Sequence, residues 1–238
     1  DIVRHLDDLA GRAHNRLYSG RRSGLGNILR DVAVGFPREI WASWPFFLVA
    51  NLLFYGPFVV GVVGALFFDG FATSVLPEAN LQQVESMYAT DIGRTAGQDA
   101  TMAGFYVWNN VGIAFRCFAT GALAGLGSVF YLVYNGLVLG TIEGHLWATG
   151  KGWNLLTFTA GHTPWELTGV VVAGTAGLEL GWALVVTGGR TRVGSLKHAG
   201  PKVYRLVMGA TAMLLVAAAI EAFFSASPIP APAKWLFG

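Results

Sequence analysis

One stretch of the chain places ionisable side chains in otherwise apolar surroundings. The segment GHTPWELTGVVVAGTAGLELG, residues 161–181, carries His162, Glu166 and Glu179 among glycine, alanine, valine and leucine. Carboxylates are almost never fully buried without partners, and an ionisable residue inside a membrane marks a functional site by default. Two roles for Glu166 stay open. It could be a first-turn carboxylate favoured by the helix dipole, or it could bind a cation, a proton or a polar group of a partner.

The sequence gives little support for metal or catalytic chemistry. His162 and Glu166 are four residues apart, but one such pair without further ligands does not define a metal site. The single cysteine, Cys117, lies in an apolar run and adds no cluster. The HExxH, GxxxxGK[ST] and G-x-S-x-G signatures do not occur. We therefore expect a protein that is not an enzyme and that has no metal and no cofactor.

Four acids and one base lie within the apolar part of the chain. The base is Arg116, and a guanidinium in a membrane span must reach the interface or form a pair. We expect Arg116 to pair with Glu143, Glu166 or Glu179. For Asn135, we expect a hydrogen bond to a neighbouring helix. The predicted intramembrane polar site comprises Glu166, His162, Arg116, Glu143, Glu179, Asn109, Asn110 and Asn135; the fourth acid is Glu221.

The elements that must position these residues are membrane helices. The chain is 53% hydrophobic and only 13% charged, and one span needs about 20 apolar residues. Residues 46–68, 166–187 and 203–224 each fit one span. Residues 105–145 are roughly twice that length, and the glycine-rich run at 121–128 is a break between two helices. The prediction is an all-α, polytopic membrane helical bundle of about five transmembrane helices.

Charge bias predicts how this bundle is oriented. The segment before the first span is rich in arginine, the loop at 69–103 is mainly acidic, and the loop at 190–202 is basic. Five spans place both basic segments on one side, and the positive-inside rule makes that side cytoplasmic. Residues 1–45 are then a cytoplasmic and interfacial helical segment, 46–224 the transmembrane bundle with an outer loop at 69–103, and 225–238 an outer-side tail leading to a further segment.

Small residues repeat at helical spacing in two of the predicted spans. Such stripes let helices approach closely in lipid. One stripe continues from Glu166 along its helix, which therefore has protein on most sides or lines a small cavity. The close packing also makes a homo-oligomer the expected state. The predicted packing residues are Gly136, Gly140, Gly144, Gly169, Ala173, Gly177 and Gly181.

Several separated motifs resemble one protein family. They are FYVWNNVGIAFRCFATGALAGLGSVFYLVYNGLVLG at 105–140, GHTPWELTGVVVAGTAGLELG at 161–181, RAHNRLYS near the start and AIEAFFS near the end. Together they resemble the stage II sporulation protein M family, in the type with a longer cytoplasmic amino-terminal region that occurs in bacteria that do not sporulate. The resemblance implies a bacterial inner-membrane protein. The family pattern falls on Asn109, Asn110, Arg116, Asn135, Gly136, His162, Glu166, Gly174, Gly177 and Gly181.

Two functions follow, and both stay open. The sporulation member of the family is similar to a scaffold that assembles peptidoglycan-degrading enzymes, and relatives of the longer type occur beside MoxR-type ATPases. This favours a non-enzymatic scaffold whose partners are envelope hydrolases or a MoxR-type ATPase system. The alternative is an ion or small-solute channel or transporter that uses Glu166, Glu179 and Arg116. The basic residues are explained by orientation and membrane lipid rather than by nucleic acid.

Overall fold

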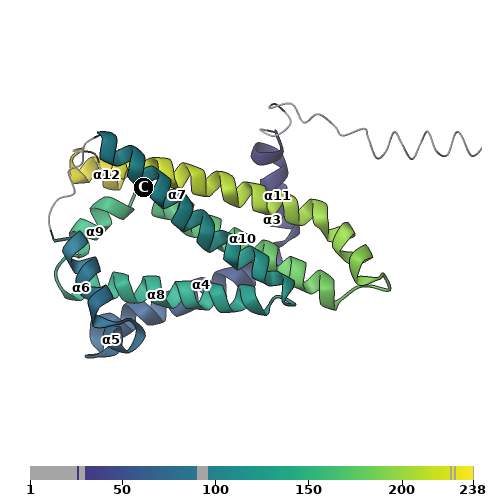
Figure 1. Cartoon of the computed structure of the whole chain (residues 1–238), viewed down its shortest axis with the longest axis horizontal. Coiled ribbons are helices and arrows are strands. Elements are labelled where there is room, and N and C mark those ends of the chain that lie inside the picture. Colours follow the sequence, from purple (N-terminus) through teal and green to yellow (C-terminus); the bar gives the residue numbers. More distant parts are fainter. Residues whose placement is uncertain (1–25, 27–29, 90–95, 226, 228, 238) are drawn as a thin grey trace, which may run out of the picture.

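The computed structural model describes residues 26, 30–89, 96–225, 227 and 229–237. Every regular element in this part of the chain is helical, and the long helices run side by side to form an elongated bundle (Figure 1). The fold is an all-α bundle, as predicted. The predicted helix before residue 19 lies outside the described residues.

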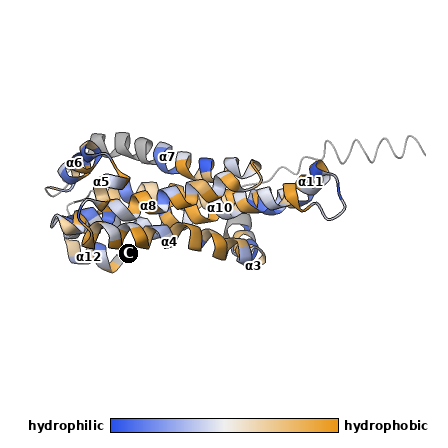
Figure 2. Cartoon of the chain, turned by 90° about the horizontal axis from the view of Figure 1, so that it is seen from below, coloured by the Kyte–Doolittle hydropathy of each residue, from blue (hydrophilic) through white to orange (hydrophobic). Residues whose placement is uncertain are grey.

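Four helices are long and apolar enough to cross a membrane. They are α4 (Trp44–Phe67), α8 (Leu126–Ala148), α10 (Thr163–Val185) and the continuous stretch Arg192–Ser225, which comprises α11 (Arg192–Ala219) and the π-helix η3 (Ile220–Ser225). A fifth long helix, α7 (Ala96–Ala119), runs with them. It carries Asn109, Asn110 and Arg116 within its length. Apolar residues cover much of the bundle's length (Figure 2).

The glycine-rich run at 121–128 separates two helices, as predicted. Helix α7 ends at Ala119, a 3₁₀ turn, η2, spans Thr120–Ala122, and α8 begins at Leu126. Gly125 has a φ of 85°, in the left-handed region that glycine adopts without strain. The Ser128 hydroxyl then donates to the Cys117 carbonyl at 2.6 Å. The chain thereby reverses direction, and residues 105–145 form two antiparallel helices rather than one.

Shorter helices cover the two ends of the bundle. At one end lie α5 (Phe71–Val75), α6 (Glu78–Met87), α9 (Gly152–Thr159) and α12 (Ala231–Phe237); we call this the α6–α12 end. Away from that end, η1 (Asp31–Gly35) and α3 (Phe36–Ala42) pack beside α11, where Phe36 lies against Gly209; we call the end of the bundle on this side, which also carries the 190–202 loop, the α3 end. Figure 1 shows α5, α6, α9 and α12 at one end of the long helices and α3 away from them, beside α11.

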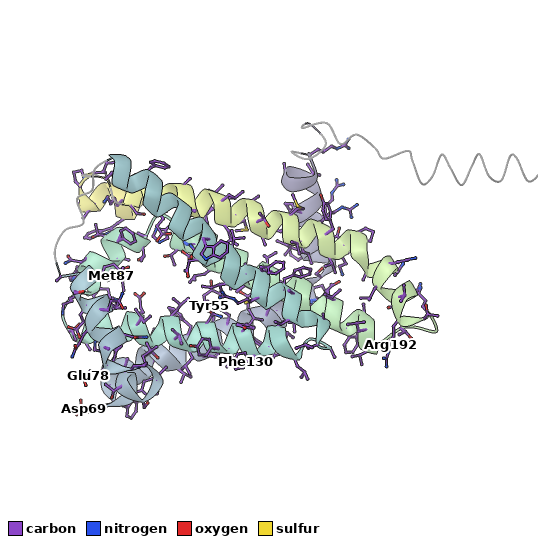
Figure 3. All side chains as sticks on the ribbon, in the orientation of Figure 1. Tyr55, Asp69, Glu78, Met87, Phe130 and Arg192 are labelled. Atoms are coloured by element: carbon purple, nitrogen blue, oxygen red, sulfur yellow. The ribbon has the colours of Figure 1, made fainter. Side chains whose placement is uncertain are left out.

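The two ends differ in charge. The predicted outer loop contributes Asp69, Glu78 and Glu85 to the α6–α12 end, whereas Arg192 and the other basic residues of the 190–202 loop lie at the α3 end. Figure 3 shows Asp69 and Glu78 at one extreme of the bundle and Arg192 at the other. Arg205 on α11 donates to Glu39 on α3 at 2.9 Å. The described residues that precede the first span therefore lie beside α11, the helix that begins in the 190–202 loop.

Helix α10 is the centre of the bundle. It contacts α4, α7, α8 and α11, and every residue from Gly169 to Gly177 is buried. The small residues of α10 permit this burial because each lets a different neighbouring segment approach the helix closely. Gly169 lies against Leu214 of α11, Gly174 against Leu132 of α8, and Gly181 against the backbone at Gly125.

Helices α4 and α8 form the closest pair. Their contact follows the predicted stripe on α8, where Gly136, Gly140 and Gly144 face the backbone oxygens of Phe54, Phe58 and Val62 in turn. The step of four residues on both helices keeps the two backbones in contact over two turns. Gly61 makes the reciprocal approach, toward the backbone of α8 at Leu137 and Thr141. No side chain larger than hydrogen fits at this seam without moving a helix.

Substitution of Gly140 by alanine tests this seam. A Cβ at Gly140 would lie 2.7 Å from the carbonyl carbon of Phe58, so Gly140→Ala should destabilise the protein by about 1–3 kcal/mol, the usual cost of overpacking. Gly56→Ala is the matched control, because a Cβ there has nothing within 4 Å and alanine favours a helix by up to about 1 kcal/mol over glycine. Thermal unfolding in detergent should rank Gly56→Ala at or above wild type and Gly140→Ala below it. Equal stabilities would contradict the close contact.

Candidate functional site

The start of α10 carries a buried histidine between two carboxylates. His162 is the residue before the helix, and Pro164 and Glu166 both lie in its first turn. His162 is only 3% exposed. Its Nε2 lies 3.9 Å from Glu166 Oε2 and 4.0 Å from Glu221 Oε1. Glu221, from a distant part of the sequence, therefore lies beside His162 together with Glu166.

The third group comes from the π-helix that continues α11. Glu221 and Ser225 are four residues apart in η3, and both are buried. They face opposite nitrogens of the same ring, because Ser225 Oγ lies 2.9 Å from His162 Nδ1. The preceding Gly161 allows this approach, since a Cβ there would be 3.2 Å from side-chain atoms of Ile220 and Phe224. The cluster of His162, Glu166, Glu221 and Ser225 thus joins the start of α10 to the end of the last long helix.

A buried lysine fixes the chain that follows the cluster. Lys234 of α12 is 5% exposed, and its ammonium donates to the carbonyl oxygens of Ser225 at 2.6 Å and Ser227 at 2.8 Å. Trp235 on the same helix donates to Thr157 of α9 at 3.2 Å. Helix α12 therefore holds η3 and α9 together around the cluster.

The second intramembrane acid of α10 forms a separate pair at the opposite end. Glu179 is 7% exposed, and its Oε1 lies 2.5 Å from the Lys202 ammonium of α11. The same lysine donates to the Ala42 carbonyl of α3 at 3.1 Å. Removal of either Glu179 or Lys202 would leave the other charge without its partner, and the loss of one partner of a buried ion pair is strongly destabilising. This pair therefore fixes the position of α11 relative to α10 and α3.

The predicted partners of Arg116 are engaged elsewhere. Glu179 pairs with Lys202, Glu166 lies beside His162, and Glu143 accepts a hydrogen bond from its own helix, from Trp147 Nε1 at 3.1 Å. Arg116 is exposed in the last turn of α7, and among the described residues its side chain has no ion pair. The expected pair is wrong because Glu143 and Glu166 lie toward the α6–α12 end, whereas Arg116 lies near the other end, within reach of lipid headgroups.

The asparagines satisfy one another or their own helix. Asn135 donates to the Tyr131 carbonyl four residues earlier at 2.7 Å, rather than to a neighbouring helix as expected. Asn109 donates to Asn110 Oδ1 at 3.1 Å, and Asn110 is 3% exposed. These residues do not join the cluster around His162. The predicted polar site is thus divided into a histidine cluster, an ion pair at the α3 end and local hydrogen bonds.

The part of α10 between Glu166 and Glu179 is apolar. The residues from Gly169 to Gly177 are buried, and the one hydroxyl among them, Thr175, donates to the Val171 carbonyl of the same helix at 2.8 Å. A cavity of about 50 Å³ beside Ala173 is lined mainly by apolar side chains, including Phe118 and Leu214. Apolar cavities of this kind stay dry. The thirteen steps along the helix from Glu166 to Glu179 span roughly 20 Å at 1.5 Å per residue.

An ionic contact also anchors α6 to the bundle. Glu85 Oε1 lies 2.7 Å from His145 Nε2, and Glu85 Oε2 lies 2.7 Å from the Lys151 ammonium. The hydrogen bond from Lys151, followed by that with His145, lowers the pKa of the Glu85 carboxyl below its ordinary value. Asn154 also donates to the Tyr88 carbonyl at 2.9 Å. Helix α6 is therefore attached to α8 and to the start of α9.

Sequence reasoning missed the residues that complete the histidine cluster. Glu221 was recognised as an acid within a span, but it was not placed with His162. Ser225 and Lys234 gave no signal of their own. The motif AIEAFFS contains Glu221 and Ser225 at a spacing of four, which was the available indication that both share a helix face.

Fold and charge distribution together define a polytopic, all-α membrane protein with polar sites at both ends of a tightly packed core. The chain belongs to the stage II sporulation protein M family, whose pattern matches residues 52–226. The match includes α8, α10 and the whole His162 cluster. No curated protein and no solved structure matches the chain.

The attachment of α6 should depend on pH. Because the folded-state pKa of Glu85 is lowered, its contribution is fully present above the ordinary carboxyl pKa and is lost as the pH falls through the lowered value. A spin label at exposed Gln83 should therefore become more mobile as the pH falls below about 4.5. In Glu85→Gln the label should already be mobile at pH 7. Glu78→Gln is the control, because Glu78 accepts a hydrogen bond from Gln82 of its own helix and, among the described residues, has no ion pair with the bundle. An unchanged Glu85→Gln spectrum would contradict the anchoring role.

Proposed function

We propose that this protein is a non-enzymatic scaffold of the bacterial cytoplasmic membrane, with its amino-terminal segment in the cytoplasm. In this role the long helices form a rigid core, and the helices at its two ends hold partners in place. The partners that the family resemblance favours are peptidoglycan-remodelling hydrolases on the outer side or a MoxR-type ATPase system on the inner side.

The separation of the charged sites along α10 carries this proposal. Glu166 and Glu179 are the acids that a transport path would use, but each already has a neighbour within the chain: His162 for Glu166 and Lys202 for Glu179. Between them, α10 is closely packed and apolar. A route for ions needs polar groups or water at successive depths. The described residues offer groups of this kind at the ends of α10 rather than along it.

A flux assay separates the scaffold from the transporter. We expect purified protein in proteoliposomes to carry no protons or small cations across a range of pH and membrane potential. Glu166→Gln at matched incorporation should behave as wild type does. Flux that disappears in Glu166→Gln would overturn the scaffold and make the start of α10 part of a pathway.

Site-specific crosslinking tests the positive side of the proposal. A photo-crosslinker at exposed Gln83 or Met87 of α6 should capture an envelope hydrolase in living cells. The same crosslinker at Leu52, which is 64% exposed on the apolar helix α4, is the matched control and should capture none. Recovery of the same proteins from all three positions would count against a docking site at α6.

Cysteine labelling tests the orientation. Cys117 is fully buried, so the wild-type protein should react little with a membrane-impermeant thiol reagent in intact cells. Gln83→Cys at the α6–α12 end should be labelled from outside, whereas Lys197→Cys at the α3 end should be labelled only after the membrane is opened. The opposite pattern would reverse the proposed topology.

The outward face of α7 is the proposed site of homo-oligomer contact. Trp108 is 81% exposed and Phe115 is 63% exposed, and the polar Asn109 is exposed beside them. An amide facing lipid is unfavourable. A second copy packed on α7 would cover this face.

A further inference from the structure

The geometry around His162 indicates more than a structural contact. A nitrogen of His162 and a carboxylate oxygen from each of Glu166 and Glu221 lie within 4.8 Å of one another. A zinc ion about 2.1 Å from three such donors holds them roughly 3.4 Å apart. The observed separations from His162 Nε2, 3.9 and 4.0 Å, need only small side-chain rotations to reach that spacing.

Charge gives a second reason for a cation here. Two carboxylates converge on one imidazole nitrogen in surroundings where His162 is 3% exposed and Glu221 is 7% exposed. When His162 carries its proton on Nδ1 and donates to Ser225, the lone pair of Nε2 faces both carboxylates. The negatively charged carboxylates repel each other and the lone pair of Nε2, and this repulsion is strong where the dielectric constant is low. A divalent cation between them changes the repulsion into attraction.

The surroundings of the ring match those of metal ligands. A histidine that binds a metal through one nitrogen usually donates from its other nitrogen to a fixed acceptor, which sets the tautomer and the ring orientation. Ser225 Oγ, 2.9 Å from His162 Nδ1, is placed to be that acceptor. Ser225 is itself held through its carbonyl by Lys234.

The local fold also favours a ligand site. Glu221 and Ser225 lie in the π-helix η3, and π-helical turns occur frequently at functional sites because they change which side chains face a neighbour. His162 and Glu166 come from the start of α10. The three donors thus come from two helices at the α6–α12 end, and Glu166, with 20% of its side chain exposed, leaves the cluster partly accessible.

We propose that His162, Glu166 and Glu221 bind one divalent transition-metal cation, with zinc as the best match. One imidazole and two carboxylates suit zinc better than calcium or magnesium, which prefer all-oxygen sites. Three protein donors leave a fourth position for a water molecule. The ion would join the first turn of α10 to η3. This assignment does not depend on the scaffold role.

Metal binding by the purified full chain tests the assignment. The protein should carry an affinity tag without histidine, so that the tag adds no zinc site. After treatment with a chelator and dialysis, titration with zinc chloride in detergent should show one ion bound per chain. X-ray absorption of the zinc-loaded protein should show a single imidazole together with oxygen ligands. A folded wild type that binds no zinc would overturn the proposal.

Conservative variants locate the site. Glu221→Gln and Glu166→Gln should each weaken zinc binding by about tenfold or more, because each removes one charged ligand. Glu143→Gln is the matched control: Glu143 lies in α8, accepts from Trp147 and should leave the affinity unchanged. Zinc should also raise the unfolding temperature of wild type and of Glu143→Gln, but not that of Glu221→Gln. Equal zinc affinities in wild type and both cluster variants would place the ion elsewhere and refute the site.

Discussion

The cost of a charged group in hydrocarbon governs where the acidic residues of α10 lie. No water hydrates a carboxylate in the middle of a bilayer, so an ionised side chain must reach an interface or find a partner inside the protein. The chain meets this constraint twice on α10. Near the start of the helix, Glu166 keeps 20% of its side chain exposed, and near its end Glu179 pairs with Lys202. The apolar middle of α10 is therefore free to serve packing alone.

That division explains the role of the glycines. In lipid there is little hydrophobic force between helices, so association depends on close contact between backbones. Gly136 and Gly140 bring α8 against α4, and Gly169 and Gly181 bring α10 against α11 and the turn before α8. The ionic and polar contacts then select one arrangement among the several that such smooth surfaces allow. The glycine contacts supply the contact area, and the polar contacts at the two ends of α10 define how the helices are aligned along their axes.

Features that depend on neighbouring residues along the chain were predictable from the sequence. The spans follow from apolar length, the break before α8 follows from its glycines, and the stripe from Gly136 to Gly144 follows from helical periodicity. Pairings between helices were not predictable in this way. The partner of Glu179 is Lys202, a residue assigned to a cytoplasmic loop because its charge suggested an interface. The expectation for Arg116 failed for the same reason, since depth along a helix alone does not tell which helices are neighbours.

The same physical argument locates function at the ends of the bundle. A core in which α10 contacts four other long helices has few alternative packings, and closely packed interfaces change between discrete arrangements rather than deforming continuously. The less regular elements, the π-helix η3 and the short helices α9 and α12, gather around His162 at one end. A polar cluster held by irregular backbone can change its ligands without disturbing the glycine contacts of α4 and α8. The core therefore provides rigidity, and the α6–α12 end is where binding of a ligand or partner can alter local structure.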